Sequence, residues 1–156
     1  FLPDTAGAGR FRGALGLVRE YRLLEDEALV QVRSDRQVNP PYGLFGGSPG
    51  APGRIIMNPG TPEERIAPAK FIGKMRRNEL LRAEMPGAGG YGNPLQRDPW
   101  AVAEDVRQEK LSAATARDVY GVVLDGQAPD EEATRTLRAS LGRREEAATG
   151  NTTGRA

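Results

Sequence analysis

The chain of 156 residues contains neither cysteine nor histidine. The lack of cysteine excludes disulfides and thiolate chemistry, and the lack of histidine removes the commonest general base and the commonest metal ligand. A Ser-His-Asp triad therefore cannot form. No apolar run approaches the roughly 20 residues that span a bilayer, and no signal peptide is visible. These absences predict a cytoplasmic protein without a membrane partner.

An excess of charge of one sign is also missing. The 22 Lys and Arg residues nearly balance the 21 Asp and Glu residues, which gives a formal net charge of +1. Both signs are spread along the chain, so no basic field predicts a nucleic-acid partner. Adjacent carboxylates such as Glu63-Glu64 and Glu104-Asp105 are expected in turns or on polar helix faces, and no clustered spacing indicates a metal site. The chain alone is therefore predicted to bind no cofactor or metal and to lack a complete active site.

Glycine and proline are abundant. The 20 Gly and 12 Pro residues accompany a hydrophobic fraction of only 38%, a composition that favours a loop-rich fold relying on a partner. Two stretches concentrate them, residues 39–53 and 84–94. Prolines fix φ and glycines permit positive φ, so such loops follow a defined path without regular structure. Long loops in compact domains are often functional or interfacial.

The first two-thirds of the chain is predicted to be rich in β-hairpins. Apolar and polar residues alternate in residues 15–24 and again in residues 28–32, with the polar turn Glu25-Asp26-Glu27 between them. Alternation with period two predicts strands, and the short polar turn predicts a hairpin. A second hairpin is predicted from residues 66–75 and 80–85.

The last third is predicted to be helical. Asp98 followed by Pro99 is typical of an N-cap and first helical position, and Ser112 and Asp130 are expected to cap two further helices. Gly142 is predicted to end the last one. The predicted class is α+β, with hairpins and long Gly/Pro loops followed by two or three short helices. The predicted regions are a β-rich region with structured loops (1–97), a helical region (98–142) and a disordered tail (143–156).

The stretch between the two regions invites a nucleotide-binding interpretation, because Gly87, Gly89 and Gly92 match G-x-G-x-x-G. A dinucleotide loop also needs a preceding parallel strand, a helix beginning within it and an acidic residue about 20 positions later. Pro94 interrupts the helix, and no βαβ unit surrounds the motif. We instead expect these glycines, with Gly90, to take positive φ where the strands give way to helices.

Several exposed or loop residues are candidates for binding. Arg10 and Arg12 share one face of an extended segment, either as a solvated basic edge or as a contact to an anion or carboxylate. Asp35 and Arg36 form a polar cluster that either ends a strand or points into a site. The complete candidate set of substrate or interface residues is Arg10, Arg12, Asp35, Arg36, Tyr42, Phe45, Gly87, Gly89, Gly90 and Tyr91.

The aromatic residues have packing interpretations beside the functional ones. Tyr42 and Phe45 are expected to anchor their long loop on the sheet, although an interface role is equally open. Tyr91 is expected to anchor the glycine stretch or to face a site. Trp100, the single tryptophan, is expected to be a buried packing residue.

Short motifs in a fixed order give the sequence a family resemblance. They are Gly7-Ala8-Gly9-Arg10-Phe11-Arg12-Gly13, Arg19-Glu20-Tyr21, Ser34-Asp35-Arg36, Pro41-Tyr42-Gly43-Leu44-Phe45-Gly46-Gly47, Asn58-Pro59-Gly60, Pro86-Gly87 to Pro94, Arg97-Asp98-Pro99 and Tyr120-Gly121-Val122-Val123-Leu124. Together they resemble the C-terminal portion of the hydantoinase B/oxoprolinase family. The sequence departs from the family pattern at Asn93, where aspartate is common.

The resemblance implies a part of a B-type subunit that works with an ATP-binding A-type subunit in a hetero-oligomer. It implies an ATP-dependent hydrolase that opens cyclic amides such as hydantoin or oxoproline. ATP and a divalent metal are then expected elsewhere in the complex, the metal in the N-terminal part of the B-type subunit. Two alternatives stay open: a non-catalytic interaction module of such a complex, and part of a related ATP-dependent ketone carboxylase.

Overall fold

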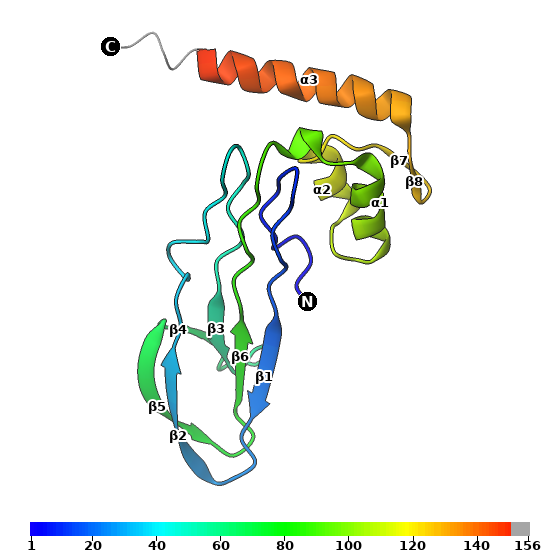
Figure 1. The fold of residues 1–156 in the computed structure, drawn as a ribbon. Helices are drawn as coiled ribbons and strands as arrows, with labels where there is room; N and C mark the ends of the chain where they lie inside the picture. The colour runs from blue at the N-terminus through cyan, green and yellow to red at the C-terminus, as the bar shows by residue number, and fades with distance from the viewer. Residues whose placement is uncertain (151–156) are drawn as a thin grey trace, which may run out of the picture.

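The computed structural model describes residues 1–150 and has the predicted class, with strands first and helices last (Figure 1). The strands are β1 (Val18–Arg22), β2 (Glu27–Arg33), β3 (Arg54–Met57), β4 (Arg65–Ala67), β5 (Lys70–Arg76), β6 (Leu80–Glu84), β7 (Leu124–Asp125) and β8 (Ala128–Pro129). The helices are a short 3₁₀ helix η1 (Pro94–Gln96), α1 (Pro99–Arg107), α2 (Ala113–Asp118) and α3 (Glu131–Gly150). No helix in the described residues is both long and apolar enough to cross a membrane.

The strands exist where the alternation predicts them, but the two predicted hairpins are wrong. β1 pairs with β6 and β2 pairs with β5, both antiparallel. The two predicted turns lie against each other, since Leu23 N donates to Glu79 O and Arg77 N donates to Asp26 O. The β1–β2 and β5–β6 segments therefore form one long antiparallel ribbon that folds back on itself at its turns (Figure 1).

The folded ribbon encloses the first hydrophobic core. One layer is a four-stranded sheet with the order β1-β6-β3-β4, and the other is the β2-β5 pair. Pro68 lies between β4 and β5, where the chain leaves the first sheet and enters the second. The buried side chains between the layers are Ile55, Met57, Ala67, Met75, Leu81 and Ala83.

Three glycine-rich segments lie side by side above the sheets (Figure 1). We call residues 5–16, 41–53 and 86–92 the glycine-rich bundle. Its segments are joined by main-chain hydrogen bonds, for example Gly7 N to Ala88 O, Ser48 N to Ala8 O and Gly90 N to Ser48 O. The bundle connects the sheets to the helices and is therefore the joint of the molecule.

Most glycines of this bundle allow its segments to approach one another closely, and few of them have a positive φ. A Cβ at Gly89 would lie 1.9 Å from Tyr42 O, and one at Gly87 would lie 1.8 Å from Thr5 O. Of the four positions predicted to have positive φ, only Gly92 has it, at +74°. The expectation for Gly87, Gly89 and Gly90 is thus wrong. Glycine is needed at these three positions because neighbouring main chain occupies the space that a side chain would fill.

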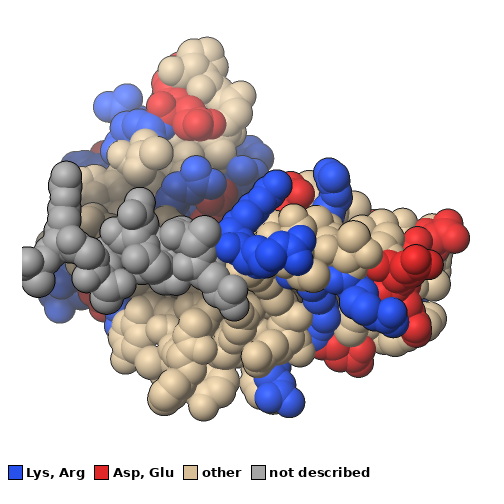
Figure 2. Space-filling model, turned by 90° about the horizontal axis from the view of Figure 1, so that it is seen from above, with Lys and Arg blue, Asp and Glu red and all other residues tan. Residues whose placement is uncertain are grey.

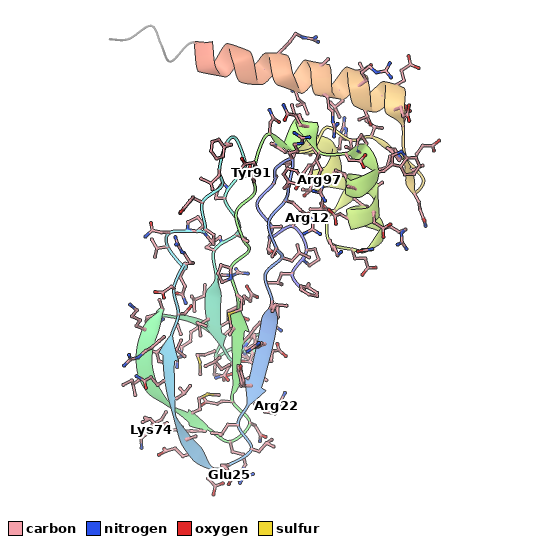
Figure 3. All side chains as sticks on the ribbon, in the orientation of Figure 1. Arg12, Arg22, Glu25, Lys74, Tyr91 and Arg97 are labelled. Atoms are coloured by element: carbon pink, nitrogen blue, oxygen red, sulfur yellow. The ribbon has the colours of Figure 1, made fainter. Side chains whose placement is uncertain are left out.

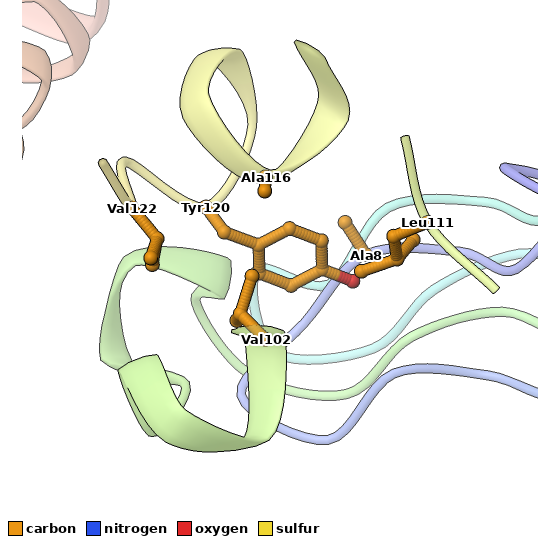
Figure 4. Close-up of a cluster of buried hydrophobic side chains, with 6 residues drawn as sticks. All are labelled: Ala8, Val102, Leu111, Ala116, Tyr120 and Val122. Carbon is orange, nitrogen blue, oxygen red and sulfur yellow. The ribbon is translucent and has the colours of Figure 1, made fainter. Parts of the chain in front are cut away.

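The helices surround a second core (Figure 4). The ring of Tyr120 packs in a cluster with Val102, Ala116 and Val122, and all four are fully buried. Ala8 of the glycine-rich bundle belongs to the same cluster, so the bundle and the helices share a core. The predicted caps at Asp98 and Ser112 are confirmed, since their side chains accept from Trp100 N and Thr115 N.

Two expectations for the last third are wrong. Trp100 is 58% exposed, because it lies in the first turn of α1 on the side away from Val102. The third helix does not end at Gly142 but continues to Gly150. A single glycine costs a helix only about 1 kcal/mol, and the residues that follow are mostly good helix formers. Within the predicted disordered tail, residues 143–150 are helical and residues 151–156 lie outside the described part.

Candidate functional site

Three aromatic side chains cluster at the end of the glycine-rich bundle nearest the helices. Tyr91 lies 5.1 Å from Phe45 and 6.3 Å from Phe11 between ring centroids. Tyr91 is held in place by main-chain bridges to Phe11 and Leu44 on its two sides. We call Phe11, Leu44, Phe45 and Tyr91 the aromatic tip; Tyr91 is labelled in Figure 3.

The aromatic tip is open to solvent. Phe45 is 77% exposed, Phe11 60% and Tyr91 48%. The guanidinium of Arg10 lies 5.6 Å from the centre of the Phe11 ring, which adds a cation at the border of the patch. Exposed apolar patches bordered by polar groups often mark interaction sites.

The expected anchoring of Tyr42 and Phe45 on the sheet is wrong, since Tyr42 is also exposed. The loop does not need side-chain anchors because its two arms hold each other. Gly50 N donates to Pro41 O, and a Cβ at Gly43 would lie 2.1 Å from Gly47 O. The interface interpretation of these two residues stays a prediction.

Arg12 does not join Arg10 at the surface. Its Nε lies 2.7 Å from Oδ2 of Asp105 and its Nη2 lies 2.8 Å from Oδ1. Arg97 adds a third contact, from Nη2 to Oδ2 at 2.9 Å. The carboxylate that Arg12 binds is therefore inside the chain. The three side chains join the bundle, α1 and the residue that follows η1 (Figure 3 labels both arginines).

This ion-pair cluster is largely shielded from water. Only 6% of the Asp105 side chain is exposed, against 17% for Arg12 and 15% for Arg97. Burial alone would raise the pKa of Asp105, but the hydrogen bonds and charges of the two arginines lower it below its ordinary value. Burial raises the pKa of the neighbouring Tyr120 hydroxyl. Asp105 is therefore ionised, and both of its oxygens accept hydrogen bonds from the arginines. Its role is to link the bundle to α1, and it is not free to act as a base.

Asp35 and Arg36 lie elsewhere, at a crevice between the two sheet layers. The crevice has a volume of about 720 Å³ and its walls are mainly apolar, including Val30, Ile55 and Leu81. Arg36 has a positive φ of +62°, and its carbonyl accepts from Gly53 N. No residue of the aromatic tip lines this crevice, so the candidates occupy separate places.

The glycine stretch does not fit a phosphate group. Three of its glycine amides already donate within the fold, Gly87 N to Ala51 O, Gly90 N to Ser48 O and Gly92 N to Leu44 O. Among the described residues, no group of three acidic side chains could hold a metal ion. The arrangement offers an exposed surface at the aromatic tip.

Sequence reasoning missed Arg97, Leu44 and Phe11, and its expectation that Asp105 lies on a polar helix face or in a turn is wrong, since Asp105 is buried. A usable signal existed for Asp105, because it follows the buried Val102 by three residues and so shares its helix face. An acidic residue on an apolar helix face requires a partner. The departure at Asn93 has a structural role, as its Oδ1 caps η1 by accepting from Leu95 N at 2.7 Å.

The fold and site describe an α+β unit with two cores, a glycine-rich bundle that joins them and an exposed aromatic tip. Residues 1–94 match the sequence pattern of the Hydantoinase B/oxoprolinase family. The chain belongs to the hydantoinase B/oxoprolinase family.

Relatives of known name share this region. The caprolactamase subunit beta of Pseudomonas jessenii is 33% identical over 89% of this chain and 25% of its own length. The acetone carboxylase alpha subunit of Xanthobacter autotrophicus is 42% identical over 88% of this chain and 23% of its own length. The crystal structure of ATP-dependent caprolactamase from Pseudomonas jessenii superposes with a TM-score of 0.70 at 29% identity, over 88% of this chain and 25% of that one. The chain thus spans about a quarter of the length of these relatives.

Proposed function

We propose that this chain is the C-terminal portion of a B-type subunit in an ATP-dependent cyclic amide hydrolase. The observation that carries the proposal is the family match over residues 1–94, combined with a chain that spans about a quarter of its relatives. The partners are an ATP-binding A-type subunit and the N-terminal part of the B-type subunit, in a cytoplasmic hetero-oligomer. The ATP and the divalent metal are proposed to lie in those partners, the metal in the N-terminal part of the B-type subunit.

The role of this portion is to bind and position its partners. The aromatic tip supports this role, since Phe45 and Tyr91 are exposed on segments that main-chain hydrogen bonds join to one another. Rigid aromatic side chains lose little conformational entropy on binding and are enriched among the residues that dominate interface energies. The tip is the proposed contact to the A-type subunit.

A second candidate is part of an ATP-dependent ketone carboxylase. It is favoured by the 42% identity to the acetone carboxylase alpha subunit, against 33% to the caprolactamase beta subunit. The same binding role applies in both complexes, because the region compared is the same.

Reconstitution tests the proposal. This chain, tagged, is co-expressed with an A-type subunit and the remainder of a B-type subunit from the same genome. Native mass spectrometry with metal analysis of the purified assembly is expected to show a hetero-oligomer that holds the metal. ATP-dependent ring opening of hydantoin, oxoproline and caprolactam is then compared with ATP-dependent carboxylation of acetone.

Turnover of a cyclic amide supports the first candidate, and turnover of the ketone supports the second. Calorimetry on the isolated chain is expected to show no ATP binding. Tight ATP binding by the isolated chain, or failure of the three chains to associate, would overturn the proposal.

A further inference from the structure

The two edges of the four-stranded sheet differ. β4 is only three residues long and is followed at once by Pro68, and such short, proline-ended edges resist pairing with another strand. β1 is five residues long, contains no proline, and is exposed along its whole length. β1 is therefore the edge that remains open for an additional strand.

The main-chain groups of β1 have a fixed direction. Leu17 O accepts from Met85 N, which lies next to β6. The preceding carbonyl, Gly16 O, accepts from Leu2 N on the opposite side. Successive residues of a strand direct their main-chain groups to alternate sides. The N–H and C=O groups of Val18, Glu20 and Arg22 therefore point away from β6.

The beginning of the chain shows how a strand would lie along this edge. Leu2 pairs with Gly16 in antiparallel orientation, and the N-terminus lies beside the start of β1 (Figure 1). A strand that extends this pairing runs antiparallel to β1. Apolar side chains are available along its path, because Leu17 is 38%, Val18 36% and Tyr21 54% exposed.

We propose that the free edge of β1 binds an extended segment from the rest of the B-type subunit, antiparallel to β1 and continuous with the Leu2–Gly16 pairing. This inference rests on the proposed function, since the occupant belongs to the roughly three-quarters of the relatives that this chain does not span. Addition of a strand to an open edge supplies main-chain hydrogen bonds for affinity and side-chain contacts for specificity. The docked segment turns the four-stranded sheet into a five-stranded one that bridges the two parts of the subunit.

The test compares Glu20→Pro with Glu20→Ala in the reconstituted complex. Both variants remove the ion pair between Glu20 and Arg82, but only proline removes the outward N–H. Proline is compatible with an edge strand when its missing N–H faces outward. The incoming strand then loses one hydrogen bond and keeps an unpaired carbonyl, so Glu20→Pro is expected to raise the Kd roughly tenfold above that of Glu20→Ala.

A second measurement uses the wild-type chain. Amide hydrogen exchange followed by NMR is expected to slow at Val18, Glu20 and Arg22 when the remainder of the B-type subunit binds, and to stay unchanged at Ile66 on the β4 edge. This exchange measurement tests the strand proposal even if Glu20→Pro fails to fold. Protection that instead rises with the concentration of the isolated chain would assign the edge to a second copy and overturn the proposal.

The outcomes separate this inference from the proposed function. If wild-type chains associate while the three β1 amides remain unprotected and the two variants bind alike, the strand inference fails and the proposed function stands. If the wild-type chains do not associate, both fail.

Discussion

Arg12 and Asp105, which are 93 positions apart, form a two-point ion pair with contacts of 2.7 and 2.8 Å. Arg12 lies in the glycine-rich bundle and Asp105 in α1, so the pair fixes the helices against the bundle. The parallel geometry of a guanidinium and a carboxylate makes such contacts directional as well as strong.

Removing the carboxylate of Asp105 should lower the free energy of unfolding substantially. Asp105→Ala leaves Arg12 and Arg97 buried with unpaired charge, and we expect a loss of about 3 kcal/mol in the free energy of unfolding. Urea titration followed by circular dichroism measures it. Glu104→Ala is the matched control, because its pair with Arg107 is on the exposed side of the same helix and should change stability little. Equal effects of the two substitutions would contradict the assigned role.

Acid should remove the contribution of Asp105. Its folded-state pKa is lowered, mainly because the two arginines overcome the effect of burial. A lowered pKa contributes stability that is present above the unfolded value of about 3.9 and is lost as the pH falls through the folded value. The stability gap between wild type and Asp105→Asn should therefore be constant near neutral pH and shrink below about pH 4. A gap that persists into strongly acidic solution would argue against this assignment.

Two glycines should respond to alanine in opposite ways. Gly89→Ala places a Cβ 1.9 Å from Tyr42 O, so the segments of the bundle must move apart, and we expect a loss of more than about 3 kcal/mol or failure to fold. Gly142→Ala meets nothing within 4 Å and lies inside α3, where alanine is favoured by up to about 1 kcal/mol. Thermal unfolding of both variants gives the comparison. A mild effect at Gly89 would show that the bundle is loosely packed.

The aromatic tip should matter for association and little for folding. Phe45 is 77% exposed, so Phe45→Ser should leave the free energy of unfolding of the isolated chain within about 0.5 kcal/mol of wild type. Binding of this variant to the A-type subunit should weaken about tenfold or more, because a few aromatic anchors carry most of the energy of an interface. Ile72→Ser, at a residue that is 64% exposed on β5, is the control, and titration calorimetry measures both. A comparable loss of affinity in the two variants would show that replacing any exposed apolar side chain weakens binding, and would contradict a specific role for Phe45.

The sequence predicts where the strands and helices lie, but it does not predict which strands pair with each other. Alternation locates strands and their faces because successive side chains point to opposite sides, yet it carries no information about the neighbouring strand. The acidic turn after Leu24 has the composition of a hairpin turn. In the structure its main chain pairs with the other turn, through Arg77 N and Asp26 O. Helix starts were predictable because a cap such as Asp98 or Ser112 acts within three residues.

The same distinction applies to the candidate site. The sequence predicts a carboxylate contact as one role for Arg12, but its partner is too distant in the chain to be found from spacing. The interface role of Tyr91 and Phe45 stays a prediction, and their mutual contact arises only when the arms of the bundle come together. The glycines of residues 87–90 are predicted from the sequence to supply positive φ, whereas in the structure they allow close approach of neighbouring main chain.

The glycine-rich bundle has a thermodynamic consequence. It buries mostly peptide groups, and hydration of polar surface lowers the heat capacity of unfolding while hydration of apolar surface raises it. The two apolar cores should therefore account for nearly all of the heat-capacity change, which should fall below the usual value of about 12–15 cal/mol/K per residue. Since this quantity sets the curvature of stability against temperature, the joint between the sheets and the helices should weaken less on cooling than the cores it connects.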